Sequence, residues 1–137
     1  MSARILIVDD DPAIRSLLRL VAARAGFEAH VAADGKQAMA LLASGNYQIM
    51  LLDLMMPVMS GYEVLAQLDG IATAPPVIIV SAMADGRPAL DSKRVHGILH
   101  KPFDVDRVVQ LLTDVVQALG PHCDPSRLAG RSFSAVC

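Results

Sequence analysis

The sequence predicts an α/β fold built on an open parallel β-sheet with helices on both faces. Two observations carry this prediction: short apolar runs rich in Val, Ile and Leu alternate with helical patterns, and the alternation repeats five times along the chain. Strands that are apolar throughout are typical of a sheet covered on both faces, and repeated strand–helix alternation is typical of parallel pairing. A length of 137 residues is sufficient for one such domain with a sizeable core.

The first strand and the first helix are sharply defined. Arg4–Val8 is an apolar, β-branched run that stops at three consecutive aspartates. Pro12 suits the first turn of a helix, with Asp11 as its N-cap, and Gly26 is expected to end that helix. Between them, apolar residues recur at helical spacing, at Ile14, Leu17, Leu18 and Val21.

The later elements follow the same scheme. Further strands are expected at residues 28–31, 48–52, 77–80 and 98–99. Further helices are expected at residues 36–43, at Gly61–Leu68, and from the cap Asp104 to residue 119. The last of these helices has a broad apolar face, which could pair two chains or could simply cover the sheet.

The stretch between Ser81 and Lys101 departs from the regular alternation. Residues 85–88, with the sequence Asp-Gly-Arg-Pro, interrupt the helix expected there, and Pro88 could open only a short helix over residues 89–93. We therefore expect an atypical, shortened fourth helix. Residues 120–137 show no periodicity, so we expect a domain over residues 1–119 followed by a tail or linker.

Charge and composition argue against several classes of protein. The formal net charge of −2 is unlike that of a nucleic-acid-binding protein, which normally has a basic face. No apolar run is long enough to cross a membrane, and no signal peptide is evident, so no membrane insertion is expected. Cys123 and Cys137 form neither a disulfide framework nor a zinc pattern. This favours the reducing cytoplasm, with a disulfide between two chains as the alternative.

Chemically active side chains stand at the ends of the predicted strands. Asp9 and Asp10 follow the first strand, Asp53 the third, Ser81 the fourth and Lys101 the fifth. In open parallel sheets these ends share one edge, where ligands bind. Clustered carboxylates without nitrogen or sulfur ligands suit a hard cation, Mg²⁺ or Mn²⁺. A lysine beside them indicates an anionic ligand, and a phosphoryl group fits because its transfer depends mostly on positioning and charge neutralisation.

Four short blocks make the pattern more specific. They read Val-Asp-Asp-Asp-Pro at residues 8–12, Leu-Asp-Leu-Met-Met-Pro at residues 52–57 with Gly61 after it, Val-Ser-Ala at residues 80–82, and Lys-Pro-Phe at residues 101–103. In this order the blocks resemble the signature of the receiver domains of two-component response regulators, over residues 1 to about 119. The resemblance implies a chemotaxis-Y-like, flavodoxin-like fold, with five parallel strands in the order 2-1-3-4-5.

The resemblance also implies a role for each matching residue. Asp53 matches the phosphoacceptor, and Ser81 and Lys101 match the hydroxyl and the ammonium that contact the phosphoryl group. The implied Mg²⁺ ligands are the carboxylates of Asp9, Asp10 and Asp53 and the backbone carbonyl of Met55. Pro102 matches a proline whose preceding peptide bond is usually cis.

The implied function is signalling rather than turnover of a substrate. A histidine kinase or a histidine phosphotransfer protein would donate the phosphoryl group, and a downstream protein partner would recognise the phosphorylated form. The domain would promote its own phosphorylation and dephosphorylation. No DNA-binding helix-turn-helix follows residue 119, so no direct contact with nucleic acid is expected.

One position departs from the family pattern. Receiver domains usually have Tyr or Phe three residues before the lysine, and here that position is Ile98. Because Ile98 has neither a ring nor a hydroxyl, the usual aromatic switch is not expected. We expect instead that the region of residues 82–100 changes order on phosphorylation.

Two other functions stay open at this point. A receiver-like module could serve as a scaffold without ever carrying a phosphoryl group. A small Mg²⁺-dependent hydrolase could use Asp53 as a transient nucleophile. Such hydrolases typically carry a second acid two residues after the nucleophile, where this chain has Met55.

Overall fold

Strands and helices alternate along the described part of the chain except between the last two strands, where residues 83–94 lie outside the described ranges. The computed structural model describes residues 3–56, 58–71, 74–82 and 95–119. The strands are β1 (Arg4–Val8), β2 (Glu28–Ala32), β3 (Ile49–Asp53), β4 (Val77–Ser81) and β5 (Val95–His100). The helices are α1 (Pro12–Arg24), α2 (Gly35–Ser44), α3 (Gly61–Leu68) and α4 (Val105–Leu119).

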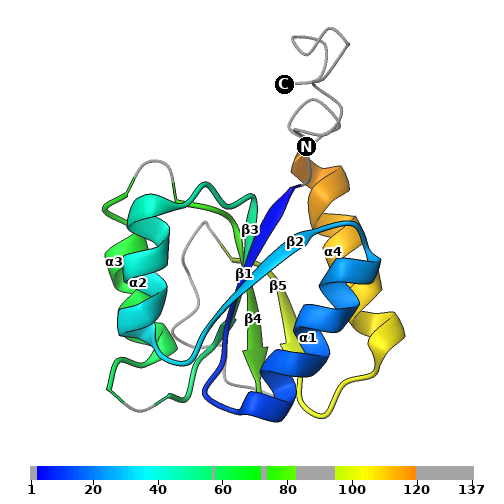
Figure 1. The fold of residues 1–137 in the computed structure, drawn as a ribbon, viewed down its shortest axis with the longest axis horizontal. Helices are drawn as coiled ribbons and strands as arrows, with labels where there is room; N and C mark the ends of the chain where they lie inside the picture. The colour runs from blue at the N-terminus through cyan, green and yellow to red at the C-terminus, as the bar shows by residue number, and fades with distance from the viewer. Residues whose placement is uncertain (1–2, 57, 72–73, 83–94, 120–137) are drawn as a thin grey trace, which may run out of the picture.

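The five strands form one parallel sheet in the order β2-β1-β3-β4-β5 (Figure 1). The predicted fold class and strand order are therefore confirmed. Every residue of β3 and β4 is buried, as expected for apolar strands in the middle of a covered sheet.

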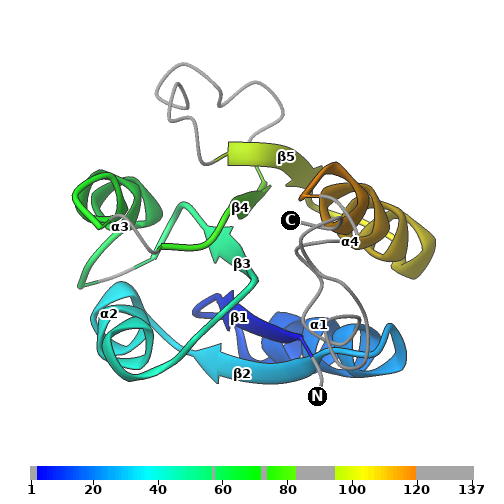
Figure 2. The ribbon, with the colours of Figure 1, turned by 90° about the horizontal axis from the view of Figure 1, so that it is seen from above.

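Helices cover both faces of the sheet, and each face has its own core (Figure 2). The helices α1 and α4 lie on one face, and α2 and α3 lie on the other. Because side chains alternate along a strand, Ile5 and Ile7 of β1 pack toward α1 and α4, whereas Leu6 and Val8 pack toward α2 and α3.

The two ends of α1 confirm the predicted capping residues. The Asp11 carboxylate accepts a hydrogen bond from the N–H of Ala13 at 2.9 Å, so Asp11 is the N-cap. At the other end Gly26 adopts a φ of 97°, in the left-handed region that favours glycine. The N–H groups of Gly26 and Phe27 donate back to carbonyls of the last turn, at 3.1 and 3.0 Å, as in a Schellman motif.

The prediction for the fifth strand was wrong in its extent. We expected a brief strand at residues 98–99, but β5 begins at Val95 and runs to His100. His96 and Gly97 have little strand propensity of their own. They are extended because β4 pairs with this segment, with a register shift between Val77 and Ile78.

Some expectations lie outside the described residues. They are the shortened fourth helix over residues 89–93, most of the region expected to change order, and the tail at residues 120–137 with Cys123 and Cys137. Within the ranges that are described, no helix is both long and apolar enough to span a membrane.

Candidate functional site

Parallel pairing brings the chemically active residues to one edge of the sheet, the lower edge in Figure 1. Asp9 follows β1, and Lys101 follows β5. Asp53 and Ser81 are the last residues of β3 and β4, rather than the residues after them as predicted. Four separate parts of the chain therefore contribute to one site.

Three carboxylates form a compact cluster at this edge, the acidic trio of Asp9, Asp10 and Asp53. One oxygen from each side chain lies within 4.8 Å of the other two. Asp9 and Asp53 are only 1% and 3% exposed, whereas Asp10 lies at the surface. Like charges this close repel one another, so the trio is costly unless a cation lies among its oxygens.

Hydrogen bonds anchor both the backbone and the side chain of Asp9. Its N–H donates to the carbonyl of Ala32 at 3.2 Å, and its own carbonyl accepts from Nη1 of Arg15 at 2.8 Å. The side-chain Oδ1 accepts from the N–H of Asp11 at 2.9 Å. The other oxygen, Oδ2, is buried and accepts no hydrogen bond from the described residues. Its charge is met by an ion pair with Lys101.

The Lys101 ammonium bridges two members of the trio. Its Nζ lies 3.0 Å from Oδ2 of Asp9 and 3.7 Å from Oδ2 of Asp53. Burial alone would lower the pKa of Lys101, but the close ion pair with Asp9 and the negative charges of the other two carboxylates raise it above its ordinary value. The backbone N–H of Lys101 donates to the carbonyl of Ser81 at 2.7 Å. The peptide bond between Lys101 and Pro102 is cis, as the resemblance implied.

The surroundings of Asp53 disfavour its charged form. Burial is the largest cause and the charge of Asp9 the next, and together they raise the pKa of Asp53 from 3.8 to about 6. Lys101 and the N–H of Met55, which donates to Oδ1 of Asp53 at 3.2 Å, act in the opposite direction. The Asp53 carboxylate would therefore gain from a bound cation at neutral pH.

This raised pKa predicts how stability depends on pH. Between about pH 4 and pH 6 the unfolded chain releases the Asp53 proton while the folded chain retains it, so the contribution of Asp53 to the free energy of unfolding falls as the pH rises. Asn carries no charge, so in metal-free buffer at pH 7 Asp53→Asn is expected to exceed the wild type by up to about 3 kcal/mol in free energy of unfolding. Near pH 4 the two should unfold at similar urea concentrations.

A control and a contrary outcome define this experiment. Asp106→Asn removes an exposed carboxylate on α4 and is expected to change stability little at either pH. Equal stabilities of the wild type and Asp53→Asn at pH 7 would show that burial does not penalise the Asp53 charge.

The backbone after Asp53 lies directly against the start of α3. The N–H of Gly61 donates to the carbonyl of Leu54 at 3.0 Å. A capping box between Ser60 and Glu63, with hydrogen bonds of 3.3 and 3.2 Å, fixes the first turn of this helix. A Cβ atom on Gly61 would overlap the carbonyl oxygen of Asp53 and lie 2.7 Å from Cα of Leu54. Glycine is required here by this close approach.

The structure brings most of the predicted site residues together. Asp9, Asp10, Asp53 and Lys101 form the cluster, and Ser81 is buried at the end of the adjacent strand. Met55 lies two residues after Asp53, with its side chain 60% exposed and its N–H on the Asp53 carboxylate.

Sequence reasoning missed Arg15. This residue lies on α1, and its guanidinium contacts the carbonyl at the end of β1. The available signal was its position in the second turn of a helix that begins just after the acidic residues, from which a long side chain can reach back over the turn.

The donor set of the acidic trio fits a hard divalent cation. All three side chains offer carboxylate oxygens, and the buried Oδ2 of Asp9 lacks a hydrogen bond from the described residues. Mg²⁺ typically binds through one or two protein carboxylates and keeps several waters, and the exposed Asp10 leaves one side of the cluster open to solvent.

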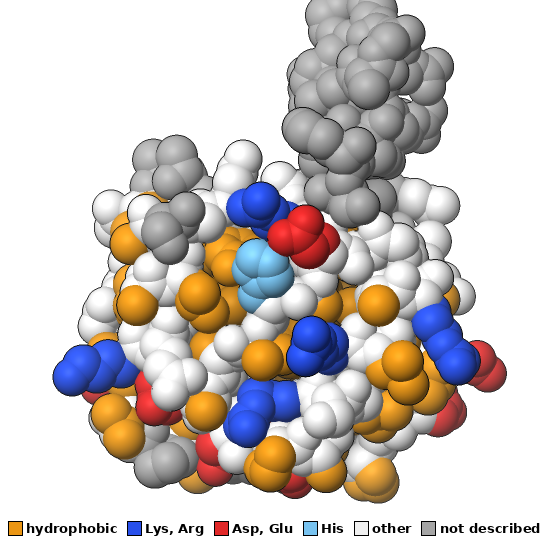
Figure 3. Space-filling model, viewed as in Figure 1, with side chains coloured by type: hydrophobic (Ala, Val, Ile, Leu, Met, Phe, Trp, Pro, Cys, Tyr) orange, Lys and Arg blue, Asp and Glu red, His pale blue; other side chains and the backbone are white. Residues whose placement is uncertain are grey.

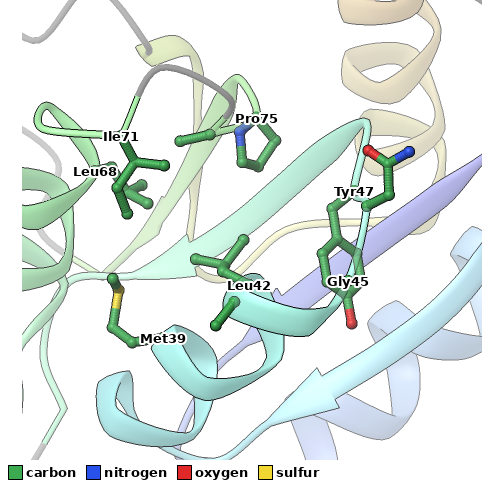
Figure 4. A pocket seen from close by; sticks show the side chains of 10 residues that line it. Met39, Leu42, Gly45, Tyr47, Leu68, Ile71 and Pro75 are labelled. Atoms are coloured by element: carbon green, nitrogen blue, oxygen red, sulfur yellow. The ribbon is translucent and has the colours of Figure 1, made fainter.

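A separate pocket of about 340 Å³ lies between α2 and α3 (Figure 4). Its lining includes Tyr47 and Pro75, which precede β3 and β4, so it lies at the opposite edge of the sheet from the acidic trio. No acidic or basic side chain of the described residues lines it.

On the face shown in Figure 3, charged side chains of both signs are interspersed with apolar ones, without a continuous basic patch.

Comparisons with known proteins point to a single family. The family described as "Response regulator receiver domain" matches residues 5–113. Sporulation initiation phosphotransferase F of Bacillus subtilis is 36% identical over 110 residues, which cover 79% of this chain and 89% of that protein. Response regulator MprA of Mycobacterium tuberculosis is 33% identical over 138 residues, 96% of this chain and 58% of that protein. The chain thus spans less than two thirds of MprA, and only 25% of regulatory protein AtoC of Escherichia coli.

Solved structures agree in fold. Response regulator TrrA of Thermotoga maritima, solved in complex with Mg²⁺ and BeF, is 32% identical with a TM-score of 0.75, over 82% of this chain and 98% of that one. The chemotaxis response regulator CheY4 of Vibrio cholerae is 26% identical, also with a TM-score of 0.75, over 84% of this chain and 99% of that one.

Proposed function

Because the chain belongs to the response regulator receiver domain family, which serves two-component phosphorelay signalling, we propose that Asp53 accepts a phosphoryl group from a phosphohistidine. The observation that carries this proposal is the buried Asp53 carboxylate at the end of β3, with Lys101 and two further carboxylates around it. This arrangement combines a nucleophile with groups suited to hold a metal ion and a phosphoryl group.

The transfer exchanges one bond to phosphorus for another. A carboxylate oxygen of Asp53 attacks the phosphorus of the donor's phosphohistidine, and a P–O bond forms as the P–N bond breaks. The electron pair of the broken bond stays on the donor imidazole, which takes up a proton if it leaves as the neutral ring. The product on Asp53 is an acyl phosphate.

The surrounding residues neutralise charge and orient the phosphoryl oxygens. The Lys101 ammonium, already an ion-pair partner of Asp53, is placed to pair with a phosphoryl oxygen. The Ser81 hydroxyl, on the adjacent strand end, would donate a hydrogen bond to another oxygen. The groups that would hold Mg²⁺, or Mn²⁺ in its place, are the carboxylates of Asp9, Asp10 and Asp53 and the carbonyl of Met55. When bound, the ion supplies positive charge that offsets repulsion between these carboxylates and the phosphoryl group.

The proposed partners follow from this chemistry. A histidine kinase or a histidine phosphotransfer protein in the cytoplasm donates the phosphoryl group, and a downstream protein recognises the phosphorylated domain. The domain promotes formation and hydrolysis of its own acyl phosphate and turns over no separate substrate. The scaffold alternative is not favoured, because each block of the receiver signature is present. The hydrolase alternative lacks its second acid, since Met55 occupies that position.

Intact mass spectrometry tests the proposal. After incubation with acetyl phosphate and Mg²⁺, the protein is expected to gain the mass of one phosphoryl group, and a chelator added beforehand should prevent the gain. No gain in mass even without the chelator would overturn the proposal in favour of a scaffold. Steady hydrolysis of small phosphate esters would overturn it in favour of a hydrolase.

A further inference from the structure

Arg15 contacts the backbone beside the acidic trio rather than any of its carboxylates. Its Nη1 donates to the carbonyl oxygen of Asp9 at 2.8 Å, from the second turn of α1. From this contact we propose that Arg15 is a positioning residue for the divalent cation: it holds the end of β1 in the conformation that presents Asp9 and Asp10 to the ion. The proposal rests on the cation site of the proposed function.

The carbonyl that Arg15 holds belongs to the peptide group between Asp9 and Asp10. Fixing this carbonyl restrains the plane of that peptide, and with it the backbone from which both side chains extend. The N–H of Asp9 and its Oδ1 are anchored separately, by Ala32 and by Asp11. Loss of Arg15 would free the side of the turn that carries the exposed Asp10.

Positioning and simple charge predict opposite effects on cation binding. The Arg15 guanidinium is a positive charge near the site, so charge alone predicts that its removal strengthens binding of a divalent cation. Positioning predicts weaker binding, because the peptide group between Asp9 and Asp10 loses its fixed orientation, and the Asp10 carboxylate loses its own with it. Lys101 provides the contrast, since its ammonium lies on the carboxylate oxygens themselves. Lys101→Met is therefore expected to bind Mg²⁺ more tightly than the wild type.

Calorimetric titration with Mg²⁺, without any phosphodonor, tests the sign of the effect. Arg15→Ala is expected to raise the Mg²⁺ dissociation constant roughly tenfold, as is typical when a residue that orients metal ligands is lost. Arg15→Lys should recover part of the affinity, because an ammonium can still donate to a carbonyl. Arg19→Ala, on an exposed position one turn further along α1, is the matched control and should bind like the wild type.

Phosphorylation by acetyl phosphate at graded Mg²⁺ concentrations gives a second readout. For Arg15→Ala the Mg²⁺ concentration at half-maximal rate should rise by the same factor, while the rate at saturating Mg²⁺ stays near that of the wild type. Thermal unfolding identifies a variant that does not fold, in which case Arg15→Lys carries the test with a smaller rise in the dissociation constant. A merely structural role would lower the melting temperature without moving the half-saturating concentration.

The outcomes separate this inference from the proposed function. Equal or tighter Mg²⁺ binding by Arg15→Ala, alongside a wild type that binds Mg²⁺ and is phosphorylated, would overturn the positioning role alone. A wild type that neither binds Mg²⁺ nor gains a phosphoryl group would overturn the proposed function, and the positioning role with it.

Discussion

Replacing Asp53 by Asn is expected to abolish phosphoryl addition from acetyl phosphate at every Mg²⁺ concentration. Asn has nearly the shape of Asp, but its amide lacks an anionic oxygen that can attack phosphorus. Neighbouring acids do not substitute readily, because the Asp9 oxygens are engaged by Asp11 and Lys101. We expect the rate, followed by intact mass, to fall at least about a thousandfold, as for loss of a covalent nucleophile.

A second variant distinguishes the acceptor from a metal ligand. Asp10→Asn leaves the Asp53 carboxylate intact, replaces one carboxylate oxygen of the acidic trio by an amide nitrogen and removes the negative charge of Asp10. Its phosphorylation should be slow at low Mg²⁺ and recover as Mg²⁺ is raised, whereas Asp53→Asn should not recover. Asp106→Asn, on the surface of α4, should behave like the wild type throughout. Phosphoryl addition to Asp53→Asn at a normal rate would place the acceptor elsewhere.

Replacing Gly61 by Ala is expected to lower both stability and phosphorylation. A methyl group at this position would collide with the backbone carbonyl of Asp53 and with Cα of Leu54, and backbone atoms cannot move aside as a flexible side chain can. Overpacking of this kind costs about 1–3 kcal/mol in free energy of unfolding, measurable by urea denaturation. Because the collision falls on the acceptor residue itself, the orientation of its carboxylate should change as well.

Gly70→Ala is the matched control for this effect. The nearest atom to a Cβ on Gly70 is the carbonyl oxygen of Gln67, at an ordinary contact distance of 3.7 Å. Its stability should therefore lie within about 1 kcal/mol of the wild type. If Gly61→Ala unfolds at the same urea concentration as Gly70→Ala, the close approach of α3 is not a constraint. Normal phosphorylation of a destabilised Gly61→Ala would show that the approach serves the fold alone.

The first strand, both ends of the first helix and the gathering of strand-end carboxylates at one edge were predictable from the sequence. Arg4–Val8 could be identified because a short apolar run rich in β-branched residues is typical of a strand in a sheet that is covered on both faces. Asp11 and Gly26 could be identified because capping depends on the few residues next to a helix end. Asp9 and Asp53 could be expected in one site because the carboxyl ends of parallel strands share one edge.

Other features depended on the tertiary structure, since they arise between segments that are distant in sequence. The early start of β5 at Val95 is imposed by pairing with β4, against the weak strand propensity of the residues that follow. The pKa of Asp53 rises because burial and the nearby Asp9 act on it together, and neither the depth of burial nor the distance is contained in local sequence.

The contacts that support the site belong to the same class. The requirement for glycine at Gly61 follows from how closely α3 approaches the end of β3. The bond from Arg15 to Asp9 follows from how α1 packs beside the end of β1. The sequence by itself determined which chemical groups stand at the ends of the strands, because that depends on local pattern and on the rules of parallel pairing. Only the tertiary structure decided their distances, their burial and the residues that hold them in place, because these depend on packing between distant segments.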